Sequence, residues 1–256
     1  MADRGRLAAG IRLALTTLTV APLRPGRVDR GTASVAMALA PAVGALLGLL
    51  TGAAGIGLLR LGAPAALGGV LVVAAGVGLT RGLHLDGLAD TVDALGSYRG
   101  RAAALEIMRR PEVGPFGVIA IVLALVVQTV GASALLARPG PAARAGVVVA
   151  TTTGRIGACA ACRRGVPAAR ADGLGALVAG SVRWPILIAW TLAVAALALP
   201  AVPGRPWHGP LAVLLGLSAA ALLVRHAVRR LGGITGDVLG AACEISVTLS
   251  YFTLSI

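Results

Sequence analysis

Three aspartates occur close together in a chain that is otherwise poor in acid. They are Asp86, Asp90 and Asp93 in the stretch HLDGLADTVDALGS, and the 256 residues of the chain include only 10 acidic ones. The i, i+4, i+7 spacing puts all three on one face of a helix, within about 60° of one another. Like charges on one face are unfavourable without compensation, and grouped carboxylates suit Mg²⁺ or Mn²⁺. The stretch therefore predicts a catalytic, metal-binding face; the alternative is a solvated loop whose aspartates pair with arginines.

A second acidic pair, Asp237 and Glu244, lies in GGITGDVLGAACEISVTLS near the end of the chain. Spaced i and i+7, these residues again share one helical face. Carboxylates within an apolar segment are costly and mark functional sites by default, so both are predicted to bind metal. The glycines ahead of them, Gly236 included, would let the backbone approach a substrate closely. The alternative is that Asp237 caps a helix and Glu244 is hydrogen-bonded inside the core.

Several basic residues could bind phosphate, because the arginine fork holds it through two hydrogen bonds. The predicted substrate-binding residues here are four arginines, Arg81, Arg109, Arg110 and Arg155, together with the neighbouring Glu106. Glu106, Arg109 and Arg110 have the spacing of a surface helix, which could equally rest on anionic lipid. Arg155 falls inside an apolar segment, where an arginine needs an anion or a polar cavity. His84, on the face opposite the aspartates, could bind substrate, act as a base or simply pack.

The elements that must position these residues are membrane helices. The chain is 57% hydrophobic and 13% charged, whereas soluble domains are about 25% charged. Apolar runs long enough to cross a bilayer recur along it. The sequence predicts one all-α, polytopic membrane domain over residues 1–256, with about seven spans and an N-terminal amphipathic helix that precedes them. The spans are expected at 33–59, 63–80, 114–137, 145–162, 184–202, 209–228 and 233–254.

The arginines orient this layout. With the N-terminus in the cytoplasm and alternating spans, 18 arginines fall on the cytoplasmic side and 4 on the other, as the positive-inside rule requires. The net charge of +13 is therefore explained by the membrane rather than by nucleic acid, which we do not expect as a partner. The longest polar connection, 81–113, lies on the cytoplasmic side with the aspartates. It is expected to carry a loop helix beside a site for a phosphate-bearing substrate.

Four motifs then carry a resemblance. In chain order they are GLHLDGLADTVDAL, ALEIMRRPEVGPFGV, RADGLG and LGGITGDVLGAACE, and together they resemble the cobalamin synthase family, the adenosylcobinamide-GDP ribazoletransferases. The resemblance implies a multi-pass protein of the bacterial inner membrane that uses Mg²⁺. It also implies the last stage of cobalamin biosynthesis, in which adenosylcobinamide-GDP is joined to α-ribazole or its 5′-phosphate and GMP is released. Such a transfer needs positioning and charge neutralisation more than covalent catalysis.

The resemblance also carries residue roles. The matching positions are Asp86, Asp90, Asp93, Arg155, Arg170, Gly173, Gly236, Asp237 and Glu244. Many members have Asp-Ser-Arg where this chain has Arg110-Pro111-Glu112, glycine in place of Ala94, and a second glutamate in place of Val247.

Two other functions remain as alternatives. The aspartate spacing is similar to that of CDP-alcohol phosphotransferases, which would predict a lipid-like acceptor. A secondary transporter would place its ionisable residues near the bilayer midplane between inverted repeats, whereas the acids here are predicted at the cytoplasmic edge. A homo-oligomer is compatible with the sequence.

Overall fold

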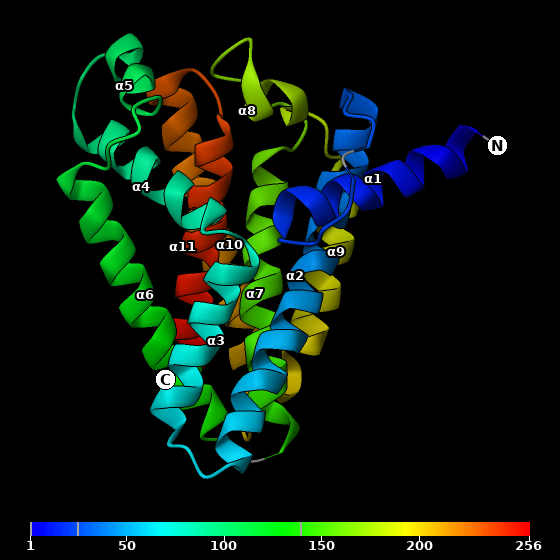
Figure 1. Cartoon of the computed structure of the whole chain (residues 1–256), viewed down its shortest axis with the longest axis vertical. Helices are drawn as coiled ribbons and strands as arrows, with labels where there is room; N and C mark the ends of the chain where they lie inside the picture. The colour runs from blue at the N-terminus through cyan, green and yellow to red at the C-terminus, as the bar shows by residue number, and fades with distance from the viewer. Residues whose placement is uncertain (1, 25, 139) are drawn as a thin grey trace.

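The computed structural model describes residues 2–24, 26–138 and 140–256, and within these ranges it is helical with no strand. The all-α prediction is confirmed. The elements are α1 (Ala2–Leu18), α2 (Arg30–Arg60), α3 (Ala65–Leu79), α4 (Leu83–Gly96), α5 (Arg101–Ile107), α6 (Pro115–Leu136), α7 (Pro141–Ala161), α8 (Gly173–Val178), α9 (Trp184–Leu197), the 3₁₀ turn η1 (Leu199–Ala201), α10 (His208–Leu231) and α11 (Gly236–Ser255). The long helices lie side by side and alternate in direction, with α1, α4, α5 and α8 at one end (Figure 1).

Each of the seven predicted spans is helical, but fewer qualify as spans by length and composition. Five helices are long and apolar enough to cross a membrane: α2, α6, α9 continued by η1, α10 and α11. The count becomes six if α3 and α4, bent by 86° at the break between them, form one broken span. The remaining predicted span is α7, which is too polar to qualify. It is surrounded by α2, α6, α9, α10 and α11, so its polar residues face protein rather than lipid.

Small residues let these helices pack closely, as expected where lipid gives no hydrophobic drive for helix association. A Cβ atom at Gly48 of α2 would lie 2.2 Å from Thr151 Oγ1 of α7. A Cβ atom at Gly154 of α7 would lie 2.3 Å from a methyl carbon of Val247 in α11. The abundance of glycine thus has a structural reason in the contacts of the central helix.

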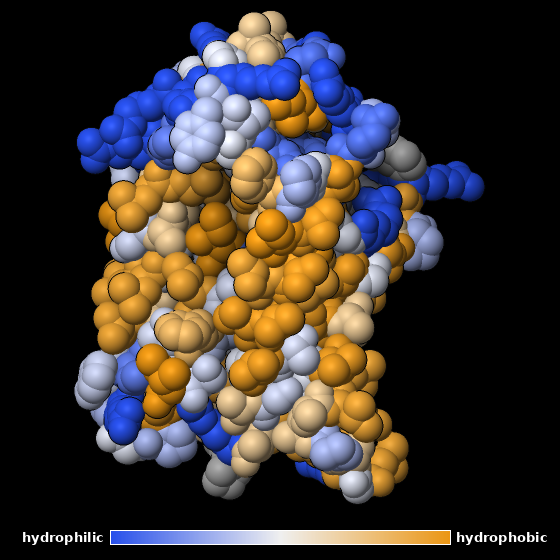
Figure 2. Space-filling view, turned by 90° about the vertical axis from the view of Figure 1, so that its left-hand side faces the viewer, coloured by the Kyte–Doolittle hydropathy of each residue, from blue (hydrophilic) through white to orange (hydrophobic). Residues whose placement is uncertain are grey.

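The surface is divided as in a multi-pass membrane protein. Figure 2 shows an apolar band around the middle of one face, with hydrophilic residues gathered at the upper end. Large apolar side chains are exposed on α6, where Leu123 and Val130 are 60% and 62% accessible. Exposure of this kind is costly in water and favourable in lipid. We therefore describe the chain as a multi-pass membrane protein.

The polar end is built from short or oblique elements. Helix α1 packs across α2, and a Cβ atom at its Gly10 would lie 2.4 Å from a methyl carbon of Val35. Asp29 caps α2 by accepting a hydrogen bond of 2.9 Å from the Thr32 amide, which, together with its ion pair to Arg27, lowers the pKa of Asp29. The loop helix predicted in 81–113 exists as α5 but ends at Ile107. Arg109 and Arg110 lie beyond it, so the prediction of one surface helix carrying both was wrong.

Candidate active site

The two acidic segments meet where α4 crosses α11. A Cβ atom at Gly87 would lie 2.7 Å from the carbonyl oxygen of Asp237, and one at Gly240 would lie 3.0 Å from the carbonyl oxygen of His84. The crossing is therefore tight on both sides, and both glycines are needed for it. It brings the helix that carries Asp86 and Asp90 against the first turn of the helix that carries Asp237.

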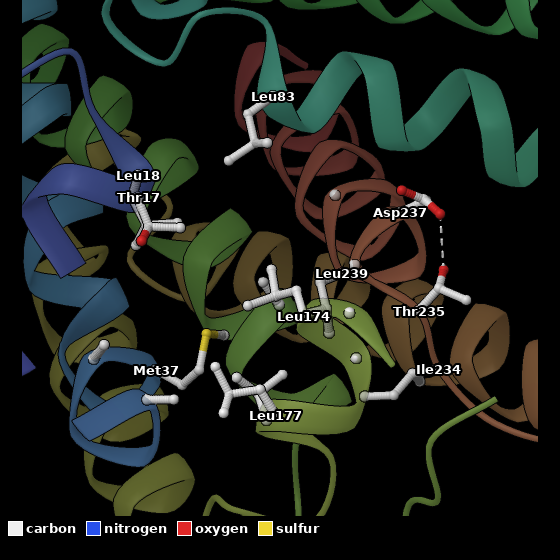
Figure 3. Close-up of a pocket in the computed structure, with 18 of the residues that line it drawn as sticks. Thr17, Leu18, Met37, Leu83, Leu174, Leu177, Ile234, Thr235, Asp237 and Leu239 are labelled. Atoms are coloured by element: carbon white, nitrogen blue, oxygen red, sulfur yellow. Dashed lines mark hydrogen bonds between the residues drawn. The ribbon is translucent and has the colours of Figure 1, made fainter. Parts of the chain in front are cut away.

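A cavity of about 530 Å³ opens beside this crossing at the polar end of the molecule. Its walls come from α1, α2, the start of α4, α8 and the start of α11. Six of the residues singled out from the sequence lie in these walls: His84, Asp86, Arg170, Gly173, Gly236 and Asp237. Figure 3 shows Asp237 and Thr235 at one edge of the cavity, with apolar side chains across its centre.

The start of α11 is fixed by Thr235, not by Asp237. Thr235 is the N-cap residue, and its hydroxyl oxygen accepts a hydrogen bond from the Val238 amide at 3.3 Å. The same hydroxyl donates to the Asp237 carboxylate at 3.1 Å (Figure 3). The capping alternative for Asp237 is thus wrong, and its half-buried carboxylate stands at the cavity.

The glycines before α11 have two different functions. Ile234 donates its amide to the carbonyl of Pro167 at 2.9 Å and accepts from the Ala169 amide at 2.9 Å. A Cβ atom at Gly233 would lie 2.4 Å from the carbonyl carbon of Ala168, so this glycine allows a contact within the protein. At Gly236 a Cβ atom would meet only Leu174, at 3.4 Å, and this residue faces the cavity as a substrate-contacting backbone would.

Few positive charges lie near the carboxylates at the crossing of α4 and α11. Asp86 is exposed and Asp90 half-buried, and among the side chains that the structure describes neither these nor Asp237 form an ion pair. Arg170 is the cation near enough to act on Asp90 and Asp237. Its guanidinium donates to the Leu105 carbonyl of α5, while its Nε is buried without a partner. The site therefore has both unpaired acceptors and an unsatisfied donor.

This donor set fits magnesium in one particular way. Mg²⁺ is commonly held by one or two carboxylates together with substrate phosphates, and Asp86 and Asp237 offer oxygen donors from facing helices. The aspartates do not form a closed cage, because in the described part of the chain only His84, Cys243 and Glu244 bring three potential ligand atoms within 4.8 Å of one another. That second group mixes nitrogen, sulfur and oxygen, which is not the set that magnesium prefers.

Asp93 has a different position from Asp86 and Asp90. Its two carboxylate oxygens accept hydrogen bonds from the backbone amides of Gly114, at 2.7 Å, and Gly117, at 2.9 Å. These amides are at the N-terminus of α6, where unpaired N–H groups and the helix dipole favour a negative charge. The buried carboxylate of Asp93 therefore anchors α4 to α6, and it does not line the cavity. The geometry gives Asp93 a structural role, and its metal and catalytic roles stay predictions from the sequence.

Glu244 and Arg155 also lie apart from the cavity. Both are buried, at 8% and 6% exposure, and both line a small inner space of about 40 Å³ between α7, α11 and the helices around them. Glu244 accepts a hydrogen bond of 2.7 Å from Gln128 of α6, and Gln128 also donates to Thr248 at 3.0 Å. Asp237 and Glu244 share a helix face but not a cavity. The alternative of a hydrogen-bonded core glutamate describes Glu244.

His84 lies between the two spaces. It lines the larger cavity, its side chain is buried, and its Nδ1 has no hydrogen-bond partner. It also lies near Glu244 and Cys243. Its side chain therefore packs into the crossing with one nitrogen left unsatisfied.

The remaining predicted residues lie around the polar end. Arg109 forms an exposed ion pair of 3.2 Å with Asp172, which itself lines the cavity. Arg81 donates to the Thr16 carbonyl of α1 at 3.2 Å. Arg110 lines a separate depression beside Asp93, and Glu106 is exposed on α5. The structure thus brings Arg170 to the cavity and places these other residues outside it.

Sequence reasoning missed the apolar walls of the cavity, which come from α1, α2 and α8. It also missed Thr235, although a threonine two residues before an acid at a helix start is a capping signal. Gln128, a lone amide in the apolar run of α6, was a second available signal, because buried polar groups need partners.

Comparison with known proteins agrees with this picture. The family model described as cobalamin-5-phosphate synthase matches residues 10–255. Adenosylcobinamide-GDP ribazoletransferases from Frankia casuarinae and Nocardioides sp. are 44% and 41% identical, over 95% and 92% of this chain and 93% of each relative. The protein of the same name from Corynebacterium efficiens is 36% identical over 95% of this chain and 90% of its own length. No solved structure matches the chain. With a family match over nearly its whole length and relatives of this identity, the chain belongs to the cobalamin-5-phosphate synthase family.

Proposed function

We propose that this protein is an adenosylcobinamide-GDP ribazoletransferase. It would join adenosylcobinamide-GDP to α-ribazole or to α-ribazole 5′-phosphate and release GMP, forming adenosylcobalamin or its 5′-phosphate. The family membership and the names of the relatives support this reaction. The site supports the chemical class, because phosphoryl transfer needs charge neutralisation around phosphate oxygens.

One observation carries the assignment to this site. Asp86 of α4 and Asp237 of α11 lie in the walls of one cavity, together with Arg170. Two carboxylates with no ion-pair partner among the described side chains leave room for a divalent cation, and an arginine with a free donor suits a phosphate oxygen. A bound metal ion would supply the positive charge that the carboxylates lack, and its pyrophosphate would supply the negative charge that Arg170 lacks.

The bond changes are those of an in-line displacement. A hydroxyl oxygen of the acceptor bonds to the phosphorus attached to cobinamide, the bridging bond from that phosphorus to GMP breaks, and GMP leaves as an anion. Because the family is described as making a 5′-phosphate product, the attacking group is a ribose ring hydroxyl rather than the 5′-hydroxyl. Its proton would pass to a carboxylate at the cavity.

Residues of the cavity would bind the metal ion and orient the substrate. Asp86 and Asp237, with Asp90 behind them, would hold Mg²⁺, or Mn²⁺ in its place. The metal would neutralise charge on the phosphate oxygens. Arg170, which lies near Asp90 and Asp237, would orient the pyrophosphate, and Gly236 would let it approach the backbone. His84, which lines the cavity, would support the crossing.

The membrane location is part of the proposal. The cavity opens at the end that carries most of the arginines, so we assign it to the cytoplasmic side of the bacterial inner membrane. This orientation would give substrates in the cytoplasm direct access to the cavity.

The test is GMP release by the purified protein in detergent, measured by chromatography with α-ribazole and with its 5′-phosphate as acceptors. We expect GMP and a cobalamin product in equal amounts from wild type, and neither from Asp86→Asn of equal folding. A product formed only with a lipid-like alcohol would instead support the CDP-alcohol phosphotransferase alternative. Substrate uptake into vesicles without any GMP would support a transporter.

A further inference from the structure

The cavity has two chemically distinct parts. One part is polar, formed by Asp86, Asp237, Arg170 and the start of α11. The other is formed by α1, α2 and α8 and the residue Val28, and its lining is apolar apart from Thr17 and, at the exposed N-cap of α8, Asp172. Figure 3 shows Met37, Leu174 and Leu177 pointing toward one another across this second part, at a distance from Asp237 and Thr235. A ligand that fills the whole cavity must therefore have an apolar body joined to a polar end.

Size decides which reactant can enter. The cavity of about 530 Å³ is in the range that holds one drug-sized ligand, about 300–1,000 Å³. A corrin with its amide side chains and adenosyl group is far larger than such a ligand and must remain outside. The candidates for the apolar part are therefore the guanine of the activated substrate and the base of the acceptor.

Hydrogen bonding separates these two bases. Guanine has donors and acceptors around its edge, and each one buried without a partner costs about 1–3 kcal/mol. The apolar part offers the side-chain hydroxyl of Thr17, while the carboxylate of Asp172 at its edge is exposed and already paired with Arg109. The base of α-ribazole is dimethylbenzimidazole, a flat fused ring with two methyl groups and a single ring nitrogen free to accept. Its apolar edge suits leucine, methionine and alanine walls.

We infer that the part of the cavity between α1, α2 and α8 binds the base of the acceptor, with its ribose directed toward Asp86 and Asp237. Leu177, Met37 and Ala36 are the side chains that set its size and hence the choice of base. This inference rests on the proposed function, and it adds the acceptor subsite and the residues that determine its specificity. In this arrangement the activated substrate reaches the aspartates from outside, and the acceptor reaches them from the apolar side.

The first test is binding of α-ribazole to the detergent-purified full chain by equilibrium dialysis, which needs no turnover. Leu177→Trp fills the apolar part, and overpacking of this size predicts about ten-fold weaker binding or more. The matched control is Leu192→Trp, the same change at a side chain that is 65% exposed on α9; it should bind as wild type does. In steady-state assays, Leu177→Trp should raise the KM for α-ribazole and leave the KM for adenosylcobinamide-GDP unchanged.

The second test looks for tighter binding, a result that misfolding of a variant cannot produce. Leu177→Ala should bind a riboside whose base carries one additional fused ring more tightly than wild type does. For wild type, removing each methyl group from the base should weaken binding about four-fold, the value of one buried carbon. If Leu177→Trp and Leu192→Trp bind α-ribazole equally, or if wild type does not bind it, the inference is overturned. GMP release by wild type is measured separately, so the proposed function could hold while the subsite fails.

Discussion

Gly87 of α4 lies directly against the backbone of Asp237 in α11, so that a Cβ atom at position 87 would be 2.7 Å from the Asp237 carbonyl oxygen. This contact joins the two acidic segments, which are 150 residues apart in the chain. The distance between the carboxylates of Asp86 and Asp237 therefore depends on a residue with no side chain.

Gly87→Ala should separate α4 from α11 and impair the site. We expect a loss of about 1–3 kcal/mol in unfolding free energy, as for other overpacked contacts, and a larger loss of turnover because the aspartates move apart. The measurements are thermal unfolding in detergent and the rate of GMP release. Gly78→Ala is the control, because a Cβ atom at this exposed position in α3 would meet nothing within 4 Å. Equal behaviour of the two variants would show that the crossing tolerates a methyl group.

Asp93→Asn should destabilise the protein rather than remove a metal. The two amides bond to different oxygens of Asp93, so in asparagine an NH₂ donor faces either the Gly114 or the Gly117 amide. The charge that favours the α6 N-terminus is lost as well. We expect a loss of about 1–3 kcal/mol in unfolding free energy, measured by thermal unfolding. Asp172→Asn breaks an exposed pair with Arg109 and should cost less than about 1 kcal/mol. If Asp93→Asn unfolds like wild type yet binds Mn²⁺ poorly, the metal role predicted from the sequence would be supported after all.

Asp86→Asn and Asp237→Asn should both weaken metal binding. We expect kcat to fall about a hundred-fold or more in each, the scale of removing one electrostatic contact with a transition state, with little change in stability for the exposed Asp86. Chelation should stop turnover by wild type, and added Mg²⁺ should restore it. Mn²⁺ titration followed by electron paramagnetic resonance measures the affinity directly. The double variant should lose less than the sum of the single losses, because ligands of one ion are coupled; additive losses would mean separate sites.

Arg155 and Glu244 should stabilise the inner core together. Each lines the same small space in the described structure, so Arg155→Met leaves a buried glutamate without its nearby positive charge. Removing one member of a buried charged set typically costs about 3–5 kcal/mol. Arg155→Met combined with Glu244→Gln should be more stable than Arg155→Met alone, in thermal unfolding. If instead the double variant is the less stable, and Arg155→Met raises the KM for the nucleotide substrate, then Arg155 contacts substrate, as the resemblance implied.

The sequence alone determined the class of protein and the helix faces that carry charge. Membrane insertion depends on composition over about 20 residues, and the face of a helix follows from its fixed 100° rotation per residue. Both are local properties, so the helical segments, the shared face of Asp86 and Asp90, and the acidic start of α11 were predictable. The family motifs, which are strings of adjacent residues, could be identified for the same reason.

Tertiary structure decided which of these residues share a cavity. Asp93 continues the aspartate face, yet α6 packs against that end of α4 and its N-terminus takes both oxygens. Glu244 continues the face of Asp237, yet α11 beyond its first turn is buried against α7 and α6. The Glu244 carboxylate therefore accepts a hydrogen bond from Gln128 and does not reach the cavity. The segment that forms α7 was predicted as a span, yet it is too polar to qualify as one, and it can be so because other helices surround it. A periodic pattern specifies a direction from the helix axis; what lies in that direction depends on contacts between distant segments, and these are fixed only when the whole bundle packs.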